Sequence, residues 1–333
     1  RLAICIVAMM CGAQSSREIQ TFAALREEGF KGFLTLANGI PNRLTIERVL
    51  RLVNPKEFSN LFNRIMRHIQ SSSKQSIVAI DGKRYYRRER ESGRANAMYM
   101  VSAWQQENAA VLGQVGVGEK SNEIIAIPEL LKILSIEDAV VTIDAIGCQK
   151  SIVKQIVKKN HAEYLIGLKG NQPIMQQEMR EYAAYCLSEP AMCDAYSTYK
   201  TLEKGHGRIE KRQYFLFSDL SWFAGRTEWE NLRSLVMVKS TRTVGNAAST
   251  TETRLYISSL QDVQQAAQAV RGHWNIENGL HWVLDVVFRE DQWATKAETA
   301  AANLATIRKL ALTFLRKAEL PAKPKLSAPL KMW

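Results

Sequence analysis

The stretches SIVAID at residues 76–81 and AVVTID at residues 139–144 share one pattern, a short apolar run that ends in an aspartate. Runs of this length that are rich in β-branched residues predict buried strands. Neighbouring strands of one sheet would bring Asp81 and Asp144 to the same edge. Either aspartate alone is also typical of a residue that caps a loop or a helix, so the functional interpretation depends on the repeated pattern.

Further strands and helices surround these two stretches. Apolar, β-branched and aromatic residues predict strands at 98–104, 109–117 and 162–170, and periodic apolar residues predict helices at 121–134 and 148–160. Three strands, a helix, a strand, a helix and a strand make a mixed sheet covered by helices. The sequence therefore predicts an α/β fold.

The rest of the chain divides by composition. We expect a helical N-terminal module at 1–72, ending in the linker SSSKQS, an α/β core that begins with 73–193, a β-rich insertion at 194–262, C-terminal helices at 263–320 and a Lys- and Pro-rich flexible tail at 321–333. Val263 to Val287 reads as one long helix, and residues 296–317 as a second. The apolar segment Leu2–Ala13 is too short to span a bilayer, so we expect a buried helix there rather than a targeting segment. Because the chain begins at Arg1 rather than Met, we also expect that preceding residues are missing.

The charge balance favours a polyanionic partner. Lys and Arg total 45 against 33 Asp and Glu, a net charge of +12. Ribosomal and membrane-surface proteins share this basicity, so charge alone does not identify the partner. Five scattered cysteines lack the spacing of a zinc site or the density of a disulfide scaffold, which favours a reducing cytoplasm. No apolar run is long enough for a membrane helix.

A third acidic group is expected in the segment RGHWNIENGLHWVLD at residues 271–285. His273, Glu277, His281 and Asp285 are four residues apart and would share one helix face. A polar stripe on an amphipathic helix usually faces solvent, and that interpretation fits His281 and Asp285 in particular. The alternation of His, Glu and His is also compatible with a zinc site.

Three carboxylates would suit metal-assisted phosphodiester chemistry. Hard oxygen ligands select Mg²⁺ or Mn²⁺, and two such ions roughly 3.5 to 4 Å apart activate the nucleophile and stabilise the leaving oxygen. In this hypothesis Asp81 bridges the two ions and Asp144 binds one of them.

Several ordered blocks carry a resemblance to a known family. They are AIDGK at Asp81, GQVGVGEKSNEIIAIPELL, VTIDAIGCQK at Asp144, LIGLKGNQ, GHGRIEKR and VRGHWNIENGLHWVLDVVFRED around Glu277. With these blocks the chain closely resembles the H-repeat-associated branch of bacterial insertion-sequence transposases, whose core belongs to the RNase H-like DDE superfamily. The resemblance spans nearly the whole chain.

The resemblance implies a fold, an activity and a site. It implies an RNase H-like catalytic sheet flanked by helices, a β-strand insertion before the last catalytic helix and a helical, DNA-associated N-terminal module. Asp81, Asp144 and Glu277 carry over as the catalytic metal ligands for Mg²⁺ or Mn²⁺, with His273 and His281 as supporting residues. The implied activity is hydrolysis at an element end that exposes a 3′-hydroxyl, followed by attack of that hydroxyl on target DNA.

The same resemblance implies the partners. They are DNA, as the terminal inverted repeats of the element and as target, and further copies of the chain in a homodimer or larger assembly. Neither ATP nor a membrane is expected, and the location would be the bacterial cytoplasm, in association with the nucleoid.

Basic residues near the blocks are candidates for DNA contact, since phosphate neutralisation calls for Lys and Arg. The cluster after Asp81 could instead be a solvated turn, partly balanced by Glu89 and Glu91. The candidates are Lys83, Arg84, Arg87, Arg88, Lys169, Lys204, Arg208, Arg212 and Arg271.

Two departures from the family pattern keep other functions open. The sequence RYYRRERESGR follows DGK, and QWATKAETA follows FRED, where the family has other residues. They motivate the alternative of a domesticated or inactive DNA-binding relic. A metal-dependent nuclease without strand transfer would share every ligand residue.

Overall fold

The computed structural model of the protein describes residues 1–69, 76–86, 97–117, 123–189, 196–205, 207–245, 248–292 and 297–318. Contacts between Cα atoms divide the chain into two compact units. The first unit holds Arg1–Ser71, Gly82–Asn122 and Ile276–Trp333, and the second holds Ser72–Asp81 and Glu123–Asn275. The division therefore falls inside strand β1, Ile77–Tyr86. The sequence-based segment boundaries remain predictions, and the tail at 321–333 lies outside the described residues.

The strands form a mixed sheet, which confirms the predicted α/β class. Hydrogen bonds join nine strands in the order β3-β2-β1-β4-β5-β9-β8-β7-β6. Strands β1, β4 and β5 are parallel to one another, whereas β2 with β3, and β5, β9, β8, β7 and β6 in succession, pair antiparallel. The other strands are β2 (Ala97–Gln105), β3 (Ala110–Val117), β4 (Val140–Ile143), β5 (Glu163–Leu168), β6 (Tyr196–Gly205), β7 (Arg208–Phe217), β8 (Ser234–Val244) and β9 (Thr250–Ser258).

The register of β1 and β4 places the two candidate aspartates. The parallel pairing runs from Ile77 opposite Val140 to Ile80 opposite Ile143, and all four residues of β4 are buried. Asp144 directly follows β4, as predicted. The prediction that Asp81 ends its strand is wrong, because β1 continues to Tyr86. The pairing with β4 nevertheless stops one residue before Asp81.

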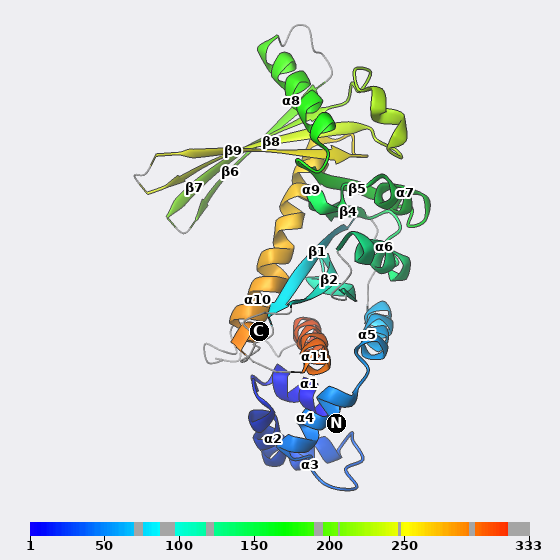
Figure 1. Ribbon diagram of the computed structural model, residues 1–333. Helices are drawn as coiled ribbons and strands as arrows, with labels where there is room; N and C mark the ends of the chain where they lie inside the picture. Colours follow the sequence, from blue (N-terminus) through cyan, green and yellow to red (C-terminus); the bar gives the residue numbers. More distant parts are fainter. Residues whose placement is uncertain are drawn as a thin grey trace. The chain divides into compact units, whose positions relative to one another are not determined.

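Helices of the second unit pack beside its strands (Figure 1). They are α6 (Glu123–Ile133), α7 (Lys150–Lys158), α8 (Pro173–Ser188) and α9 (Val263–Ile276). Helix α8 was not predicted from the sequence. Its Met175, Met179, Ala183 and Cys186 are buried on one side, which is the helical spacing. Tyr182 of α8 stacks on Trp222, with 4.6 Å between ring centroids.

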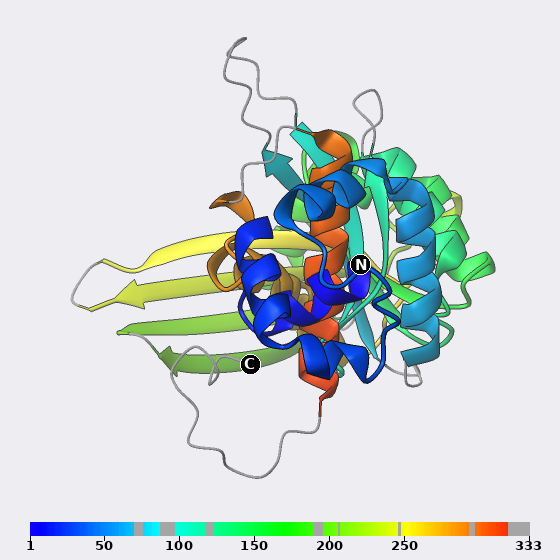
Figure 2. The same ribbon diagram turned by 90° about the horizontal axis from the view of Figure 1, so that it is seen from below.

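The β-rich insertion predicted after the core is confirmed as β6 to β9. Each of β7, β8 and β9 is buried at one end, near Phe217, Leu235 and Ile257, and exposed or half-buried at the other. Figure 2 shows these green to yellow strands as long ribbons that reach away from the rest of their unit. Gly207 turns the chain between β6 and β7 with a φ of 70°, a conformation that glycine adopts without strain.

The first unit contains the predicted helical N-terminal segment. Figure 2 shows the blue helices gathered around the orange-red helix α11. Asn303 of α11 donates from Nδ2 to the carbonyl oxygens of Leu50 and Val53, both at 2.9 Å, and so caps the end of α4. The predicted buried helix at the start of the chain is α1. The helices are α1 (Leu2–Met10), α2 (Ser16–Leu25), α3 (Glu27–Lys31), α4 (Arg43–Leu52), α5 (Pro55–Ile69), α10 (Trp282–Val286) and α11 (Glu298–Lys317).

The single helix predicted from Val263 to Val287 is interrupted. Helix α9 ends at Ile276, a π-helical segment η4 occupies Glu277–His281, and α10 follows. A π segment fits an extra residue into its turn, which changes how side chains are spaced around the helix. Such segments are frequent at functional sites. Short 3₁₀ segments occur at η1 (Ala145–Gly147), η3 (Ala224–Glu228) and η5 (Glu290–Gln292).

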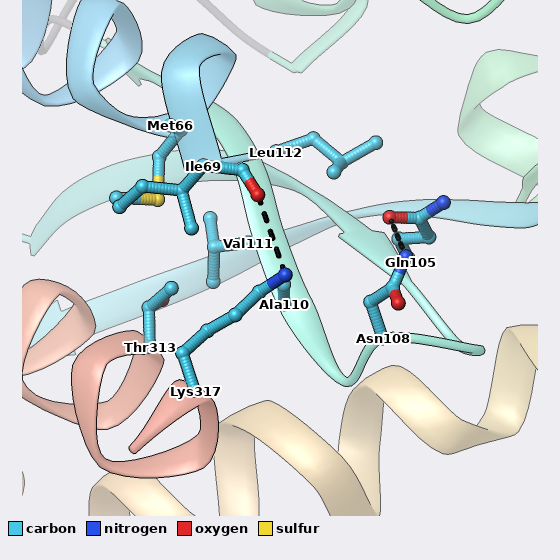
Figure 3. A pocket seen from close by; sticks show the side chains of 9 residues that line it. All are labelled: Met66, Ile69, Gln105, Asn108, Ala110, Val111, Leu112, Thr313 and Lys317. Carbon is cyan, nitrogen blue, oxygen red and sulfur yellow. Dashed lines mark hydrogen bonds between the residues drawn. The ribbon is translucent and has the colours of Figure 1, made fainter. Parts of the chain in front are cut away.

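A cavity of about 10 Å³ lies beside α5, β3 and α11 in the first unit. The side chains that line it include Met66, Val111 and Thr313 (Figure 3). A cavity of that volume holds at most one water molecule. Lys317 closes it by donating to the carbonyl oxygen of Ile69 at 3.3 Å. Among the described residues, no helix is long and apolar enough to cross a membrane.

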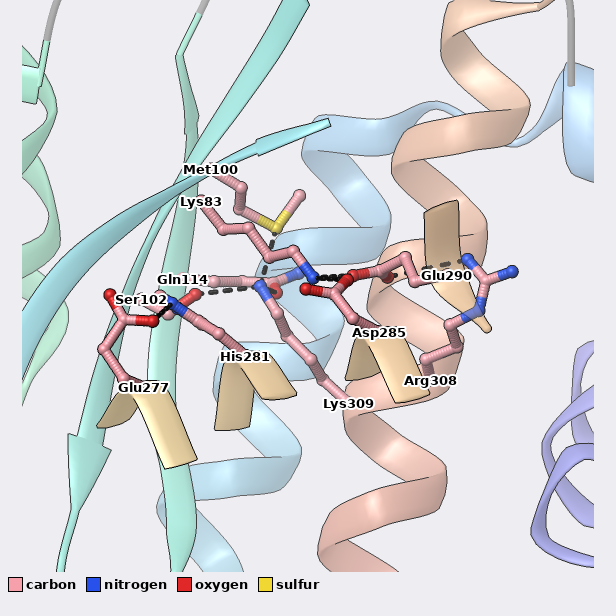
Figure 4. A network of polar contacts seen from close by, with 10 residues as sticks. All are labelled: Lys83, Met100, Ser102, Gln114, Glu277, His281, Asp285, Glu290, Arg308 and Lys309. Carbon is pink, nitrogen blue, oxygen red and sulfur yellow. Dashed lines mark hydrogen bonds and ion pairs between the residues drawn. The ribbon is translucent and has the colours of Figure 1, made fainter. Parts of the chain in front are cut away.

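Lys309 of α11 is buried in the first unit. Its Nζ donates to Ser102 Oγ at 2.8 Å and to Gln114 Oε1 at 3.0 Å, and it lies 3.0 Å from Met100 Sδ (Figure 4). Burial lowers the pKa of Lys309 from the usual 10.5 to about 7, a shift that the nearby Glu290 opposes. The ammonium is therefore costly to keep charged in the fold.

We expect Lys309→Met to remove a pH dependence of stability. Between pH 7 and pH 10.5 the unfolded chain holds the lysine proton and the folded chain does not, so this group raises stability as the pH rises through that window. The measurement is urea unfolding of both proteins across that range. The free energy of unfolding of the wild type, minus that of the variant, should rise with pH. A difference independent of pH would contradict the assignment.

Candidate active site

Asp144 lies at the C-terminal end of the parallel strands of the second unit. It follows β4 directly, and its Oδ1 accepts the backbone N–H of Ile146 at 3.0 Å as the cap of η1. The side chain is exposed. Among the described residues, no donor bonds the other carboxylate oxygen. Asp144 thus acts as a cap, as the alternative interpretation required, and still offers an oxygen to a metal ion.

Two residues of the LIGLKGNQ block hold the loop that follows Asp144. Asn171 Nδ2 donates to the carbonyl oxygen of Ala145 at 2.5 Å, and Gln172 Nε2 donates to that of Cys148 at 3.0 Å. These bonds fix the backbone on the C-terminal side of the aspartate. The block is therefore explained by support of the loop, which the sequence alone did not reveal.

Gly167 of β5 lets this loop approach the sheet. A Cβ at Gly167 would lie 3.0 Å from the backbone nitrogen of Ala145 and 3.3 Å from the carbonyl carbon of Asp144. Those are backbone atoms, and they cannot move aside without displacing the loop. A glycine is thus required where β5 passes the candidate ligand.

We expect Gly167→Ala to destabilise the protein by about 1–3 kcal/mol, because the added methyl group overpacks the contact with the Asp144 loop. The matched control is Gly116→Ala on β3, where no atom lies within 4 Å of the added Cβ. Urea unfolding of both variants measures the effect. Equal stability of the two would show that the close approach is not a constraint.

Asp81 lies within β1, one residue after the last pair with β4, and is half-buried. Since Ile80 and Ile143 are opposite each other, Asp81 and Asp144 follow at the same level of two adjacent strands. Neighbouring strands in a sheet lie about 4.8 Å apart. Asp81 and Asp144 thus follow paired residues of neighbouring strands, as expected.

Glu277 begins the π segment of the first unit. Its side chain is 61% exposed, and its Oε2 lies 3.5 Å from Nδ1 of His281. His281 itself is buried, so the interpretation that it faces solvent is wrong. The interpretation is also incomplete for Asp285, which is half-buried and ion-paired with Lys83. His281 and Asp285 are therefore packed within the protein, whereas Glu277 remains largely exposed to solvent.

His273 supports the strand that leads to Asp144. Its Nδ1 lies 3.1 Å from the hydroxyl of Thr142, a buried residue of β4. This hydrogen bond joins α9 to β4 two residues before the aspartate. His273 was expected beside the metal ligands, and the structure gives it a contact with the strand.

Glu123 is an acidic residue near Asp144 that the sequence analysis did not single out. It begins α6, and partial burial together with the charge of Asp144 raises its pKa. In the sequence Glu123 lies in the block SNEIIAIPELL, at the start of a predicted helix. That position is the feature from which it could have been found. It is a further carboxylate close to the candidate centre.

The predicted DNA-contact residues fall into two groups. Lys169, Lys204 and Arg208 are exposed. Lys83 is buried and ion-paired, and Glu203 pairs with both Arg212 and Arg271, each at 3.0 Å. Lys83 and Arg212 are thus directed at protein carboxylates, whereas Arg271 pairs with Glu203 and stays partly exposed to solvent. Arg87 and Arg88 lie outside the described residues, as does the side chain of Arg84.

A basic groove of about 520 Å³ lies beside α6 and α7 in the second unit. Two of its lysines pair with glutamates, Lys132 with Glu129 and Lys158 with Glu230. This groove is not evident in the sequence, because its residues come from two helices. The lysines that line it are Lys132, Lys154, Lys158 and Lys159.

Comparison with known proteins agrees with this arrangement of an α/β core and a helical N-terminal segment. Residues 72–314 match the family described as "Transposase DDE domain", and residues 2–66 match the family described as "DDE_Tnp_1-associated". The chain belongs to the DDE transposase family. The predicted family is thereby confirmed.

Individual relatives in this family cover most of the chain. "Putative transposase YncI" of Escherichia coli O157:H7 is 37% identical over 319 residues, which is 95% of this chain and 81% of the relative. "H repeat-associated putative transposase YhhI" of Escherichia coli strain K12 is 34% identical over 320 residues, 94% of this chain and 83% of the relative. A transposase DDE domain is the domain of a nuclease and transferase, and such domains in general use divalent metal ions.

The predicted metal ligands, each taken by itself, fit hard divalent ions. Asp144 offers an exposed carboxylate with one oxygen uncommitted to a backbone donor, and Glu277 offers a largely exposed carboxylate. Oxygen donors of this kind suit Mg²⁺ and Mn²⁺. Zinc sites rely on histidine nitrogen and cysteine sulfur, whereas the three predicted ligands, Asp81, Asp144 and Glu277, are all carboxylates. The donor set therefore fits Mg²⁺ or Mn²⁺ better than zinc.

Proposed function

We infer that the protein cleaves the ends of an insertion sequence and joins the exposed 3′-hydroxyl to target DNA, with Asp81, Asp144 and Glu277 as ligands of Mg²⁺ or Mn²⁺. The observation that carries this inference is the register of β1 and β4, which follows Ile80 and Ile143 with two aspartates at one level. Two carboxylates at the same level of adjacent strands suit the binding of a pair of divalent ions.

The ions would activate water or a 3′-hydroxyl as the nucleophile and stabilise the leaving oxygen. The protein's own part is to hold the ligands in place. Asn171 and Gln172 fix the loop after Asp144, and the bond from His273 to Thr142 fixes the strand before it. Both reactions are in-line displacements at phosphorus, so the same ligands serve both and no covalent protein intermediate is required.

DNA binding in this proposal uses exposed basic residues. Lys204 and Arg208 flank the turn between β6 and β7, and Lys169 follows β5. The lysine groove beside α6 and α7 is a further basic surface. Two element ends would be joined by a homodimer or larger assembly in the bacterial cytoplasm, without ATP.

The catalytic proposal is tested with the full chain, Mg²⁺ and DNA carrying the terminal repeats that flank its gene. We expect nicks at the element ends and strand-transfer products. Asp81→Asn, Asp144→Asn and Glu277→Gln should each lower cleavage by about 10²–10⁴-fold, because metal ligands supply several kcal/mol of transition-state stabilisation.

The control for these variants is Glu129→Gln, which removes an exposed carboxylate on α6. It should cleave like the wild type, and all four variants should bind DNA in gel shifts with Ca²⁺. Salt-sensitive binding without cleavage by the wild type would favour the DNA-binding relic instead. Cleavage without joined products would favour a nuclease. Full cleavage by Asp81→Asn would overturn the ligand assignment.

The DNA-contact proposal predicts a change in salt dependence. Replacing Lys204 and Arg208 together by Ala should lower the slope of log affinity against log salt by about 1 to 2, since each lost phosphate contact contributes about 0.9. The control is Lys31→Ala on α3, whose ammonium already pairs with Glu27 and Glu28. Fluorescence anisotropy at several salt concentrations measures the slopes. An unchanged slope in the double variant would show that this turn does not contact phosphate.

A further inference from the structure

Lys83 is enclosed by carboxylates in the first unit. It lies on β1, its side chain is 9% exposed, and its Nζ pairs with Asp285 of α10 and, at 3.0 Å, with Glu290 Oε2 of η5. Figure 4 shows the ammonium aimed at both carboxylates. A lysine held in this way cannot also reach a DNA phosphate, although it belongs to the basic run after Asp81. It needs another explanation.

The contacts continue from Glu290 to α11. The side chain of Glu290 is 1% exposed, and its Oε1 lies 3.5 Å from Nη1 of Arg308, whose side chain is 4% exposed. Two cations and two carboxylates, Lys83 and Arg308 with Asp285 and Glu290, thus alternate through the interior. We name these four residues the charge clasp. It joins a strand, the end of one helix, a 3₁₀ turn and a second helix.

Buried ion pairs of this kind are a poor source of stability. Removing charged groups from water costs several kcal/mol for each ion, and apolar side chains of similar volume often do as well. What a paired, buried charge does provide is a defined geometry, since each member accepts few alternative positions. The charge clasp is therefore best explained by the element that it positions.

That element is the π segment at Glu277–His281. Asp285 lies four residues after His281, whose Nδ1 is 3.5 Å from Glu277 Oε2. Lys83 lies two residues after Asp81, and residues two apart on a strand share a face. The charge clasp thus attaches the helix that continues from Glu277 to the strand that continues from Asp81.

Two other contacts fix the π segment itself. Arg316 of α11 donates from Nη2 to the carbonyl oxygen of Gly279 at 2.7 Å. A Cβ at Gly279 would lie 2.9 Å from Cζ2 of Trp104, so the ring packs against the segment where a side chain is missing. Arg316 also lies over that ring, 4.8 Å from its centroid. An uncommon helical turn persists only where its surroundings hold it in this way.

We propose that Lys83 is a positioning residue for the metal centre. Through Asp285 and Glu290 it holds the π segment in the conformation that presents the Glu277 carboxylate to a divalent ion. This role rests on the proposed function of Glu277 as a metal ligand. Lys83 touches neither substrate nor metal in this role.

The test uses the full-length protein with Lys83→Arg, which keeps the charge but changes the donor geometry, and with Asp285→Asn, which removes one carboxylate charge. Asp285 is only half-buried, so we expect Asp285→Asn to fold even if Lys83→Arg does not. The control is Lys31→Arg, which alters an exposed ion-paired lysine of the same unit. Three quantities are measured: Mn²⁺ affinity by calorimetry, hydrogen exchange of the amides at 277–286, and the thermal midpoint.

We expect each clasp variant to weaken Mn²⁺ binding by about tenfold, as loss of residues that orient a ligand does, and to speed exchange at 277–286. The control should change neither. Wild-type affinity and exchange in a folded Asp285→Asn variant would overturn the proposal. Uniformly faster exchange with a lower midpoint would show a structural role only and would also overturn it. Failure of wild type to bind Mn²⁺, or undiminished binding by Glu277→Gln, would instead refute the proposed function.

Discussion

The parallel pairing of β1 with β4 is the constraint on which the candidate centre depends. The paired stretches, 77–80 of β1 and 140–143 of β4, are buried, so they accept only a register in which every buried backbone group is paired. That register puts Ile80 opposite Ile143 and leaves Asp81 and Asp144 as the next residue of each strand. A slip by one residue would turn the apolar side chains of one strand to its other face. Packing of the core and alignment of the two aspartates therefore require the same register. The pairing of Ile80 with Ile143 determines where the carboxylates of Asp81 and Asp144 lie.

Much of this arrangement is readable from the sequence, because it depends on local patterns. The apolar runs that end in aspartate, the order of strands and helices, and the β-rich insertion all follow from residues that are close together in the chain. The end of β1 is the exception. Its apolar run stops at Ile80, but the strand continues to Tyr86 because β2 pairs with it, and pairing between strands is not encoded in the run itself. Helix α8 was missed because its buried face consists of Met, Ala and Cys rather than of larger aliphatic residues.

The partners of charged residues were harder to predict, because they too depend on contacts between distant parts of the chain. The basic run after Asp81 looks uniform in the sequence, yet Lys83 finds its partners about 200 positions later, at Asp285 and Glu290. Arg212 and Arg271 likewise form ion pairs with Glu203. Whether a cation faces solvent or a carboxylate depends on the tertiary fold, and no spacing rule supplies it. Net charge thus indicates a polyanionic partner without identifying the residues that meet it.

The helical segment that contains Glu277 depends both on a local sequence pattern and on tertiary contacts. An unbroken α-helix would align His273, Glu277, His281 and Asp285 on one face, and that face could be left to solvent. In the structure His273 contacts Thr142, Asp285 pairs with Lys83, and His281 is buried with its Nδ1 3.5 Å from the Glu277 carboxylate, while Glu277 stays largely exposed. Three of these side chains are thus engaged within the fold, and the fourth is largely exposed. The exposed glutamate is the first residue of the π segment, a local departure from regular geometry that Arg316 and Trp104 hold through their contacts with Gly279.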